Sequence, residues 1–403
     1  MKSHLGNGRS MIVFHCFRWY HIKNTALVLM FFTGFLVFSG PKGRADSPQL
    51  FGTTGLDQSF CKDKTFRQTV VYVDADSVQK GDTSWATNLE NKLRATLTPG
   101  ERVTVVELLP DHGTSSKLWS ACWPNYTATQ RAKLAKENFF FSSNPLNNLE
   151  KQQGFFFNGF GAAITQVFLR EEKGHKNDRS TVNGAPKEEL LESLASDGAR
   201  FSQTDETIRV IVYSNAAQNS ALGSVYDART SPMPDFGKEL GTYFRHSIFY
   251  FFGVHSTKPN DPNYLAESHA FWSQALATMS STVAGFGSDL SVANEVPVVE
   301  KRFHVSLDRN NLELSGLLNV MTDADGDLID SWLGITRLGF VSITGSYKCD
   351  DGTCVLHAST NQGLVTTSNT EKLSMKGTLT KGLSGTIGVP GSVTFPITAS
   401  AVR

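Results

Sequence analysis

Two apolar runs that each end in polar side chains constrain the fold of this chain more than any other feature. The stretch Thr69–Ser77 (TVVYVDADS) passes from β-branched and aromatic residues to two carboxylates and a hydroxyl, and Ile208–Asn215 (IRVIVYSN) repeats this layout. Continuous apolar runs of this length are typical of buried parallel strands, and open α/β sheets bind ligands at the carboxyl ends of such strands. We therefore expect two neighbouring strands whose polar ends face one cleft.

Between residues 65 and 290, predicted strands alternate with predicted helices. The strands are expected at 69–74, 103–109, 208–213 and 247–254, and the helices at 83–97, 128–139, 146–169, 186–196 and 264–286. Loops are expected between 109 and 128, at 171–185 and at 223–241. The connections between strands are long enough for crossovers, so the sheet should be largely parallel. This pattern predicts an α/β domain of Rossmann type, with helices flanking a mostly parallel sheet.

Residues 291–403 have a different character, because helical periodicity is absent and Gly, Asn and Asp turns recur. Strands are expected at 303–307, 312–321, 328–344, 354–358, 372–379 and 392–398. This spacing predicts an antiparallel all-β domain, either a sandwich or a small barrel. The acidic stretch Asp323–Asp330 contains an Asp-Gly pair between alternating runs, which predicts a hairpin turn, with weak calcium binding as the alternative.

The first 45 residues have the layout of a targeting segment. Basic residues precede the apolar run 25–39, and Gly43–Ala45 supplies small residues for a signal peptidase. The apolar run is shorter than the roughly 20 residues of a transmembrane helix. We expect a signal peptide cleaved after Ala45, with an inner-membrane anchor at 25–39 as the alternative, followed by a lead-in loop at 46–64. Either outcome exports the rest of the chain, to the periplasm or the extracellular space.

Four cysteines lie beyond the targeting segment: Cys61, Cys122, Cys349 and Cys354. An even number in an oxidising compartment predicts disulfides. Cys349 and Cys354 bracket a short turn, so we expect a local bridge there, which leaves Cys61 to pair with Cys122. The alternative is a zinc site, but no C-x-x-C pair or flanking His completes a tetrahedral set.

Composition and motifs exclude several classes of function. The chain has 38 basic and 38 acidic residues and no basic run, so we expect no nucleic-acid partner. It contains no P-loop, no G-x-G-x-x-G after a strand and no G-x-S-x-G elbow, so no motif indicates a reaction.

The region from Thr65 to Gly287 resembles a von Willebrand factor A-like domain, in the form found in exported bacterial proteins. The resemblance rests on the order of elements, the loop that begins at Asp74, and the cysteines at 61 and in Cys122–Pro124. Tyr213–Ser220 and His269–Trp272 are further likenesses. The C-terminal β-rich region resembles no family that we recognise.

The resemblance implies a site for a hard divalent cation, Mg²⁺ or Ca²⁺, at the end of the first strand. The oxygen ligands would come from Asp74, Asp76, Ser77 and Asn215. The motif departs from the family's D-x-S-x-S pattern, because Asp76 and Val78 replace the two serines and Asn215 replaces a later aspartate. The alternative is a hydrogen-bonded strand end without metal, in which case no cofactor is expected.

These observations favour an exported, non-enzymatic binding protein of the cell envelope that uses its α/β domain to contact a protein partner. Two alternatives stay open. One is a metal-dependent hydrolase that uses Asp74, Asp76 and a water molecule. The other is a structural envelope component held by its apolar N-terminus, which would be the chain's only contact with the membrane.

Overall fold

A computed structural model describes residues 55–62, 65–79, 81–137, 143–172, 181–182, 185–198, 206–226, 235–241, 244–256, 261–368 and 370–402. These residues belong to one compact unit. The predicted targeting segment at 1–45 and most of the lead-in loop lie outside the described residues; the part of that loop that is described contains the 3-10 helix η1 (Gln58–Lys62). Among the described helices, none has the length and apolar character needed to cross a membrane.

The α/β half is built on a six-stranded sheet with the order β10-β9-β6-β1-β2-β3. The strands are β1 (Arg67–Asp74), β2 (Arg102–Leu109), β3 (Thr114–Cys122), β6 (Thr207–Tyr213), β9 (Ser247–Phe252) and β10 (Thr282–Phe286). All neighbours run parallel except β3, which pairs antiparallel with β2 at one edge. The predicted fold class, a mostly parallel sheet between helices, is confirmed.

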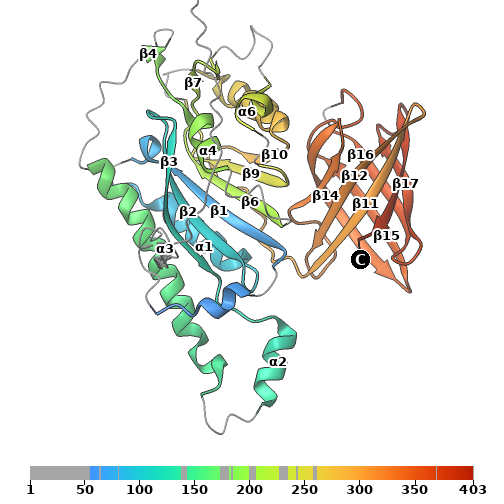
Figure 1. The fold of residues 1–403 in the computed structure, drawn as a ribbon, viewed down its shortest axis with the longest axis horizontal. Coiled ribbons are helices and arrows are strands. Elements are labelled where there is room, and N and C mark those ends of the chain that lie inside the picture. The colour runs from blue at the N-terminus through green and yellow to red at the C-terminus, as the bar shows by residue number, and fades with distance from the viewer. Residues whose placement is uncertain are drawn as a thin grey trace, which may run out of the picture. The chain divides into compact units, whose positions relative to one another are not determined.

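Helices cover both faces of this sheet because successive residues of a buried strand point to opposite sides (Figure 1). Val71 and Val73 pack with α1 (Ser84–Thr96) and α3 (Leu149–Glu172) on one face. Val70 and Tyr72 pack with α4 (Leu190–Gly198) and α6 (Tyr264–Thr278) on the other. The remaining elements are η2 (Ala75–Ser77), α2 (Ala128–Lys136), η3 (Pro145–Asn148), α5 (Phe236–Glu239) and the short pairs β4 (Thr181–Val182) with β5 (Ala185–Pro186) and β7 (Asn219–Ser220) with β8 (Gly223–Ser224).

The C-terminal half is a closed antiparallel barrel, drawn in orange and red in Figure 1. Its strands are β11 (Val299–Arg309), β12 (Leu312–Thr322), β13 (Ser331–Ile335), β14 (Gly339–Asp350), β15 (Thr353–Thr360), β16 (Lys372–Thr378), β17 (Gly382–Gly388) and β18 (Thr394–Ala401). Pairing of β11 with β18 closes the ring and leaves no open sheet edge. Alternate residues such as Phe303, Val305 and Leu307 fill the interior. Of the two predicted architectures, the barrel is the one observed.

Several predicted boundaries are wrong, each for a local reason. The helix expected at 264–286 ends at Thr278, because Ser280 adopts a left-handed backbone (φ 61°), and residues 282–286 form β10. The loop expected after residue 109 contains β3, whose first half is polar and partly exposed because it lies at the sheet edge. The strand expected at 328–344 is two strands separated by a turn at Arg337, and β17 was not predicted.

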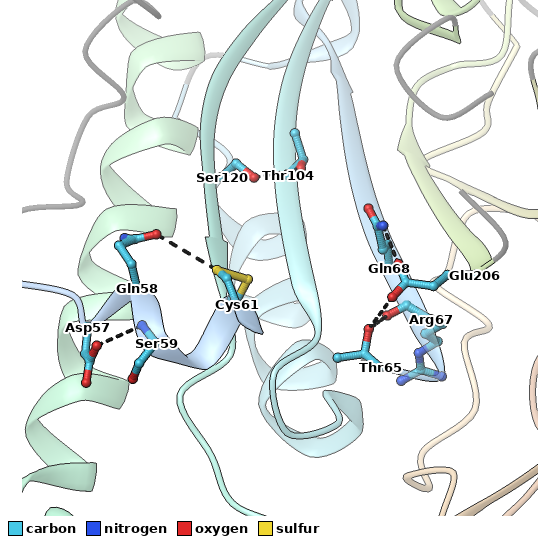
Figure 2. Close-up of a disulfide and its surroundings, with 11 residues drawn as sticks. Asp57, Gln58, Ser59, Cys61, Thr65, Arg67, Gln68, Thr104, Ser120 and Glu206 are labelled. Atoms are coloured by element: carbon cyan, nitrogen blue, oxygen red, sulfur yellow. Dashed lines mark hydrogen bonds between the residues drawn. A yellow bond between two sulfur atoms is a disulfide. The ribbon is translucent and has the colours of Figure 1, made fainter. Parts of the chain in front are cut away.

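Both predicted disulfides are present: Cys61–Cys122 and Cys349–Cys354. The first joins η1 to the last residue of β3, beside the amino ends of β1 and β2 (Figure 2). The second closes the hairpin between β14 and β15. Disulfides persist in oxidising compartments, so the pair agrees with export of this part of the chain.

Candidate functional site

The carboxyl ends of β1 and β6 meet at the centre of the sheet. The two strands are parallel neighbours, and Val73 pairs with Tyr213. The chain leaves β1 toward β2 and β3 on one side, while β6, β9 and β10 lie on the other. This reversal of strand order is a topological switch point, the position at which open α/β sheets bind ligands. The prediction that the strands containing Thr69 and Ile208 lie side by side is confirmed.

Asp74 holds the two strand ends together as a hydrogen-bond acceptor. It is 1% exposed, and its Oδ2 accepts hydrogen bonds from Ser77 Oγ (2.6 Å) and Ser214 Oγ (2.7 Å). Its Oδ1 accepts from the backbone N–H of Asp76 (3.0 Å). The backbone N–H of Asn215 donates in turn to Ser77 Oγ (2.8 Å). One buried carboxylate therefore ties the loop after β1 to the loop after β6.

The loop after β6 is anchored to the last helix as well as to Asp74. Asn215 Oδ1 accepts from the N–H of Ala217 (2.8 Å), and Ala216 has a left-handed backbone with φ of 60°. The carbonyl of Ala216 accepts from Trp272 Nε1 (2.9 Å) and Ser268 Oγ (3.2 Å), both on α6. The two short motifs of the sequence, Tyr213–Ser220 and His269–Trp272, are thus in direct contact.

Burial, and then the negative charge of Asp76, raise the pKa of Asp74 to about 6. Hydrogen bonds from Ser77, Ser214 and the Asp76 backbone lower it, but they do not restore the ordinary value. Among the described residues no cation contributes to this pKa, so the hydroxyl and backbone donors are what stabilise the Asp74 carboxylate. The Asp74 side chain is therefore sensitive to pH near neutrality.

Of the four predicted metal ligands, Asp74 and Ser77 join this network through their side chains, whereas Asp76 and Asn215 join it through their backbone N–H groups. Nowhere among the described residues do three His, Cys, Asp or Glu side chains gather in a metal-binding group. Their hydrogen bonds are directed at one another, and cation binding here stays a prediction. The acidic stretch at 323–330 is a turn, in which Asp323 Oδ1 accepts from the N–H groups of Asp325 and Asp327 (both 2.9 Å).

Aromatic rings pack beside the switch point, between the end of β6 and α1. Tyr213 stacks on Trp85 of α1, with ring centroids 4.0 Å apart. Gly253 has φ of 77°, and a side chain there would lie 2.7 Å from the Tyr213 ring, so this approach requires glycine. Burial, followed by the charges of Asp82 and Asp74, raises the pKa of Tyr213 to about 12.

Exposed residues surround the carboxyl ends of the strands. Gln79 follows η2, Thr83 precedes α1, and His255 follows β9. We call this surface the carboxyl rim. Thr83 occupies the N-cap position of α1 but makes no capping hydrogen bond through its side chain. The part of the rim that follows β1 is therefore fixed at its base by the Asp74 network.

The opposite, amino end of the sheet carries a buried ion cluster that sequence reasoning missed. Arg67 on β1 contacts Glu101 (Nε–Oε1, 3.0 Å) and Asp330 of the barrel (Nη1–Oδ2, 2.5 Å). Arg209 on β6 contacts the same Glu101 (Nη2–Oε1, 3.2 Å), and Tyr250 donates to Asp330 Oδ1 (2.6 Å). Burial alone would raise the pKa of Glu101, but the two guanidinium groups outweigh it and lower that pKa.

Further polar contacts join the barrel to the sheet at this end. Asn319 Nδ2 (3.0 Å) and Trp332 Nε1 (2.9 Å), both on barrel strands, donate to Thr207 Oγ1. Figure 2 shows the neighbouring start of β1, where Thr65 and Gln68 donate to Glu206. A signal for this cluster exists in the sequence, because Arg209 interrupts an otherwise apolar run, but its partners lie far away in the chain.

Comparisons with known proteins add little to this geometry. No family model matches the chain, and no curated protein matches it. Among solved structures, the ArnB paralog VWA2 from Sulfolobus acidocaldarius matches with a TM-score of 0.26 and 7% identity, over 78% of this chain and 65% of that one. This chain thus spans less than two thirds of that protein. The fold assignment rests on the strand order, which is consistent with the von Willebrand factor A-like fold.

Proposed function

We propose that this chain is an exported, non-enzymatic binding protein whose α/β half recognises a protein partner through the carboxyl rim. The observation that carries the proposal is the Asp74 network at the topological switch point. Its four hydrogen bonds fix the loops after β1 and β6 before any ligand arrives. Loops fixed in advance lose little conformational entropy on binding, which favours recognition of a partner. We also propose, from the strand order of its sheet, that the α/β half belongs to the von Willebrand factor A-like class.

The chemistry of the switch point supports binding rather than hydrolysis. A general base or metal ligand needs oxygen lone pairs directed at the substrate or the cation. The Asp74 oxygens instead receive three donors from their own loops. A hydrolase built on Asp74 and Asp76 would first have to break this network.

Export is the second part of the proposal. Its support comes from the two disulfides and from the basic and apolar pattern of the first 45 residues. We place the protein in the periplasm or outside the cell, with the barrel half held to the α/β half by the buried ion cluster.

The test is a pair of matched substitutions. Thr83→Arg places a long charged side chain on the carboxyl rim, and Thr386→Arg places the same side chain on the exposed surface of the barrel. Cross-linking and affinity capture from envelope extracts should yield a protein with wild type and with Thr386→Arg, and this protein should be lost with Thr83→Arg. Equal capture by all three proteins, or no specific partner for wild type, would contradict the proposal.

A further inference from the structure

A cavity of about 570 Å³ lies at the amino end of the sheet, on the opposite side from the carboxyl rim. Residues just before β9, the end of α6 and the turn between β13 and β14 line it. The lining therefore comes from both halves of the protein. Its size is within the range of small-molecule sites, roughly 300–1,000 Å³.

Three residues that line this cavity have left-handed backbones without being glycine. They are His246 (φ 62°), Ser280 (φ 61°) and Arg337 (φ 70°). Among the described residues, the other non-glycine positions with positive φ are four Asn or Asp, which tolerate this conformation, and Ala216. Such positions cost about 1–3 kcal/mol each and concentrate at ligand sites. Three side chains therefore line this cavity at positions where the backbone conformation favours glycine.

The chemistry of the lining combines positive charge with flat rings. Arg245 comes from the α/β half and Arg337 from the barrel, and both are exposed. The described lining contains no Asp or Glu that would neutralise them. His246 stacks on Trp332, with ring centroids 4.5 Å apart and an interplanar angle of 10°, and Phe340 lies 5.0 Å from Trp332.

The end of α6 does not oppose an anion here. A helix carries partial negative charge at its carboxyl end through unpaired carbonyls. In α6 the carbonyl of Leu276 accepts from the N–H of Ser281 (3.0 Å), and that of Ala277 accepts from Ser280 (3.1 Å). Ser280 donates one of these bonds and Ser281 the other, so the left-handed turn at Ser280 caps the helix at the wall of the cavity.

We infer that this cavity binds a small organic anion with a flat ring. The two arginines hold the anionic group from the two halves of the protein. The partly buried His246 ring, which packs against the buried Trp332 and Phe340, receives the flat ring. Guanidinium groups suit carboxylate, sulfonate and phosphate oxygens because their donors form a planar fork. Occupation of the site would link the barrel to the α/β half through the ligand.

The test uses two fluorescent probes that differ in charge. 8-Anilinonaphthalene-1-sulfonate is a flat-ring anion, and N-phenyl-1-naphthylamine is the same scaffold without the sulfonate. In the full chain, the anion should bind saturably at a single site. In the double variant Arg245→Gln and Arg337→Gln, the affinity for the anion should fall at least about tenfold, because charged hydrogen bonds are lost. The affinity for the neutral probe should change less than about twofold. Arg302→Gln, on the outside of the barrel, is the matched control and should change neither probe.

Arg337→Gly separates binding from folding. Glycine suits φ of 70°, so this variant should unfold at the same or a higher temperature than wild type while the anion binds about tenfold more weakly. The proposal is overturned if the arginine variants bind the anion with wild-type affinity, if the affinities for both probes fall equally, or if wild type shows no saturable binding of the anion.

Discussion

The two ends of the parallel sheet stabilise their buried charged side chains in different ways. At the amino end, Arg67 and Arg209 are paired with Glu101 and Asp330, and the cluster spans the α/β half and the barrel. At the carboxyl end, Asp74 is buried with no cation beside it among the described residues, and it depends on hydroxyl and amide donors. The first end packs against the barrel and carries the nearby disulfide, with the cavity at its border, whereas the second is bordered by exposed loops.

This difference shows in the direction of the pKa shifts. Glu101 has a lowered pKa, so the stability that it contributes is present above the ordinary carboxyl pKa and is lost as pH falls. Asp74 has a raised pKa, so its contribution is complete below about pH 4 and is lost as pH rises through about 6. The paired charges at the amino end stay ionised at neutral pH and hold the barrel to the α/β half. The Asp74 carboxyl at the other end changes its charge near neutral pH.

The largest effect is expected from breaking the amino-end cluster. Arg67→Met leaves Glu101 and Asp330 with fewer positive partners in a dry environment, so the free energy of unfolding should fall by about 3–5 kcal/mol. Urea unfolding at neutral pH measures this. The control is Arg302→Met, which removes a partly exposed ion pair with Glu300 and should cost less than about 1 kcal/mol. Equal costs at the two sites would contradict the role of the cluster.

The two disulfides give the next comparison. Cys61–Cys122 closes a separation of 61 residues, and its loss in the double alanine variant should cost about 4 kcal/mol by chain entropy. Cys349–Cys354 closes a separation of 5 residues, and its loss should cost about 2 kcal/mol. Urea midpoints of the two double variants test the order. A larger loss of stability in the Cys349/Cys354 variant than in the Cys61/Cys122 variant would contradict the predicted order.

The third prediction concerns pH at the carboxyl end. In wild type, the titration of Asp74 should lower the free energy of unfolding by about 2–3 kcal/mol as pH rises from about 4 to about 7. Asp74→Asn does not titrate, so the difference in stability between variant and wild type should change by this amount over that range. Unfolding in urea at several pH values measures it. A constant difference would mean that the Asp74 pKa is not raised.

The smallest effect is expected at a single donor. Ser214→Ala removes the hydroxyl that donates to Asp74 (2.7 Å), so the pKa of Asp74 should rise further and stability should fall by about 1–2 kcal/mol. Carboxyl ¹³C chemical shifts followed through pH report the pKa directly. Ser115→Ala, at an exposed hydroxyl pair with Ser196, is the control and should leave the pKa unchanged. A lowered pKa in Ser214→Ala would contradict the network.

Sequence reasoning reached the carboxyl end but not the amino end, and the reason is physical. Asp74, Ser77 and Ser214 follow apolar strands directly, so periodicity alone places them at one sheet edge. The partners of Arg67 are 34 and 263 residues away, and no local pattern pairs them. The barrel's closure likewise depends on β11 meeting β18, a contact that strand propensity does not encode.

The predicted metal site shows a second limit. The sequence groups Asp74, Asp76, Ser77 and Asn215 as oxygen ligands, but residue types do not reveal which way the hydroxyls donate. In the structure they donate toward Asp74 and accept from the loop after β6. The same side chains can therefore either bind a cation or hydrogen-bond to one another across the two loops. The directions of the hydrogen bonds favour the second arrangement.

Hydrogen exchange tests most directly whether Asp74 holds the loops of the carboxyl end. In Asp74→Ala, amides of 215–217 should exchange about 10–100-fold faster than in wild type. The Ser77 and Ser214 hydroxyls, which accept from the amides of Asn215 and Ala216, lose the carboxylate that holds them, and the loop that contains the Ala217 amide loosens with them. The amides of Gly100 and Trp123, which are hydrogen-bonded near the amino end, should keep their protection. Unchanged exchange at 215–217, or equal acceleration at both ends, would contradict the account.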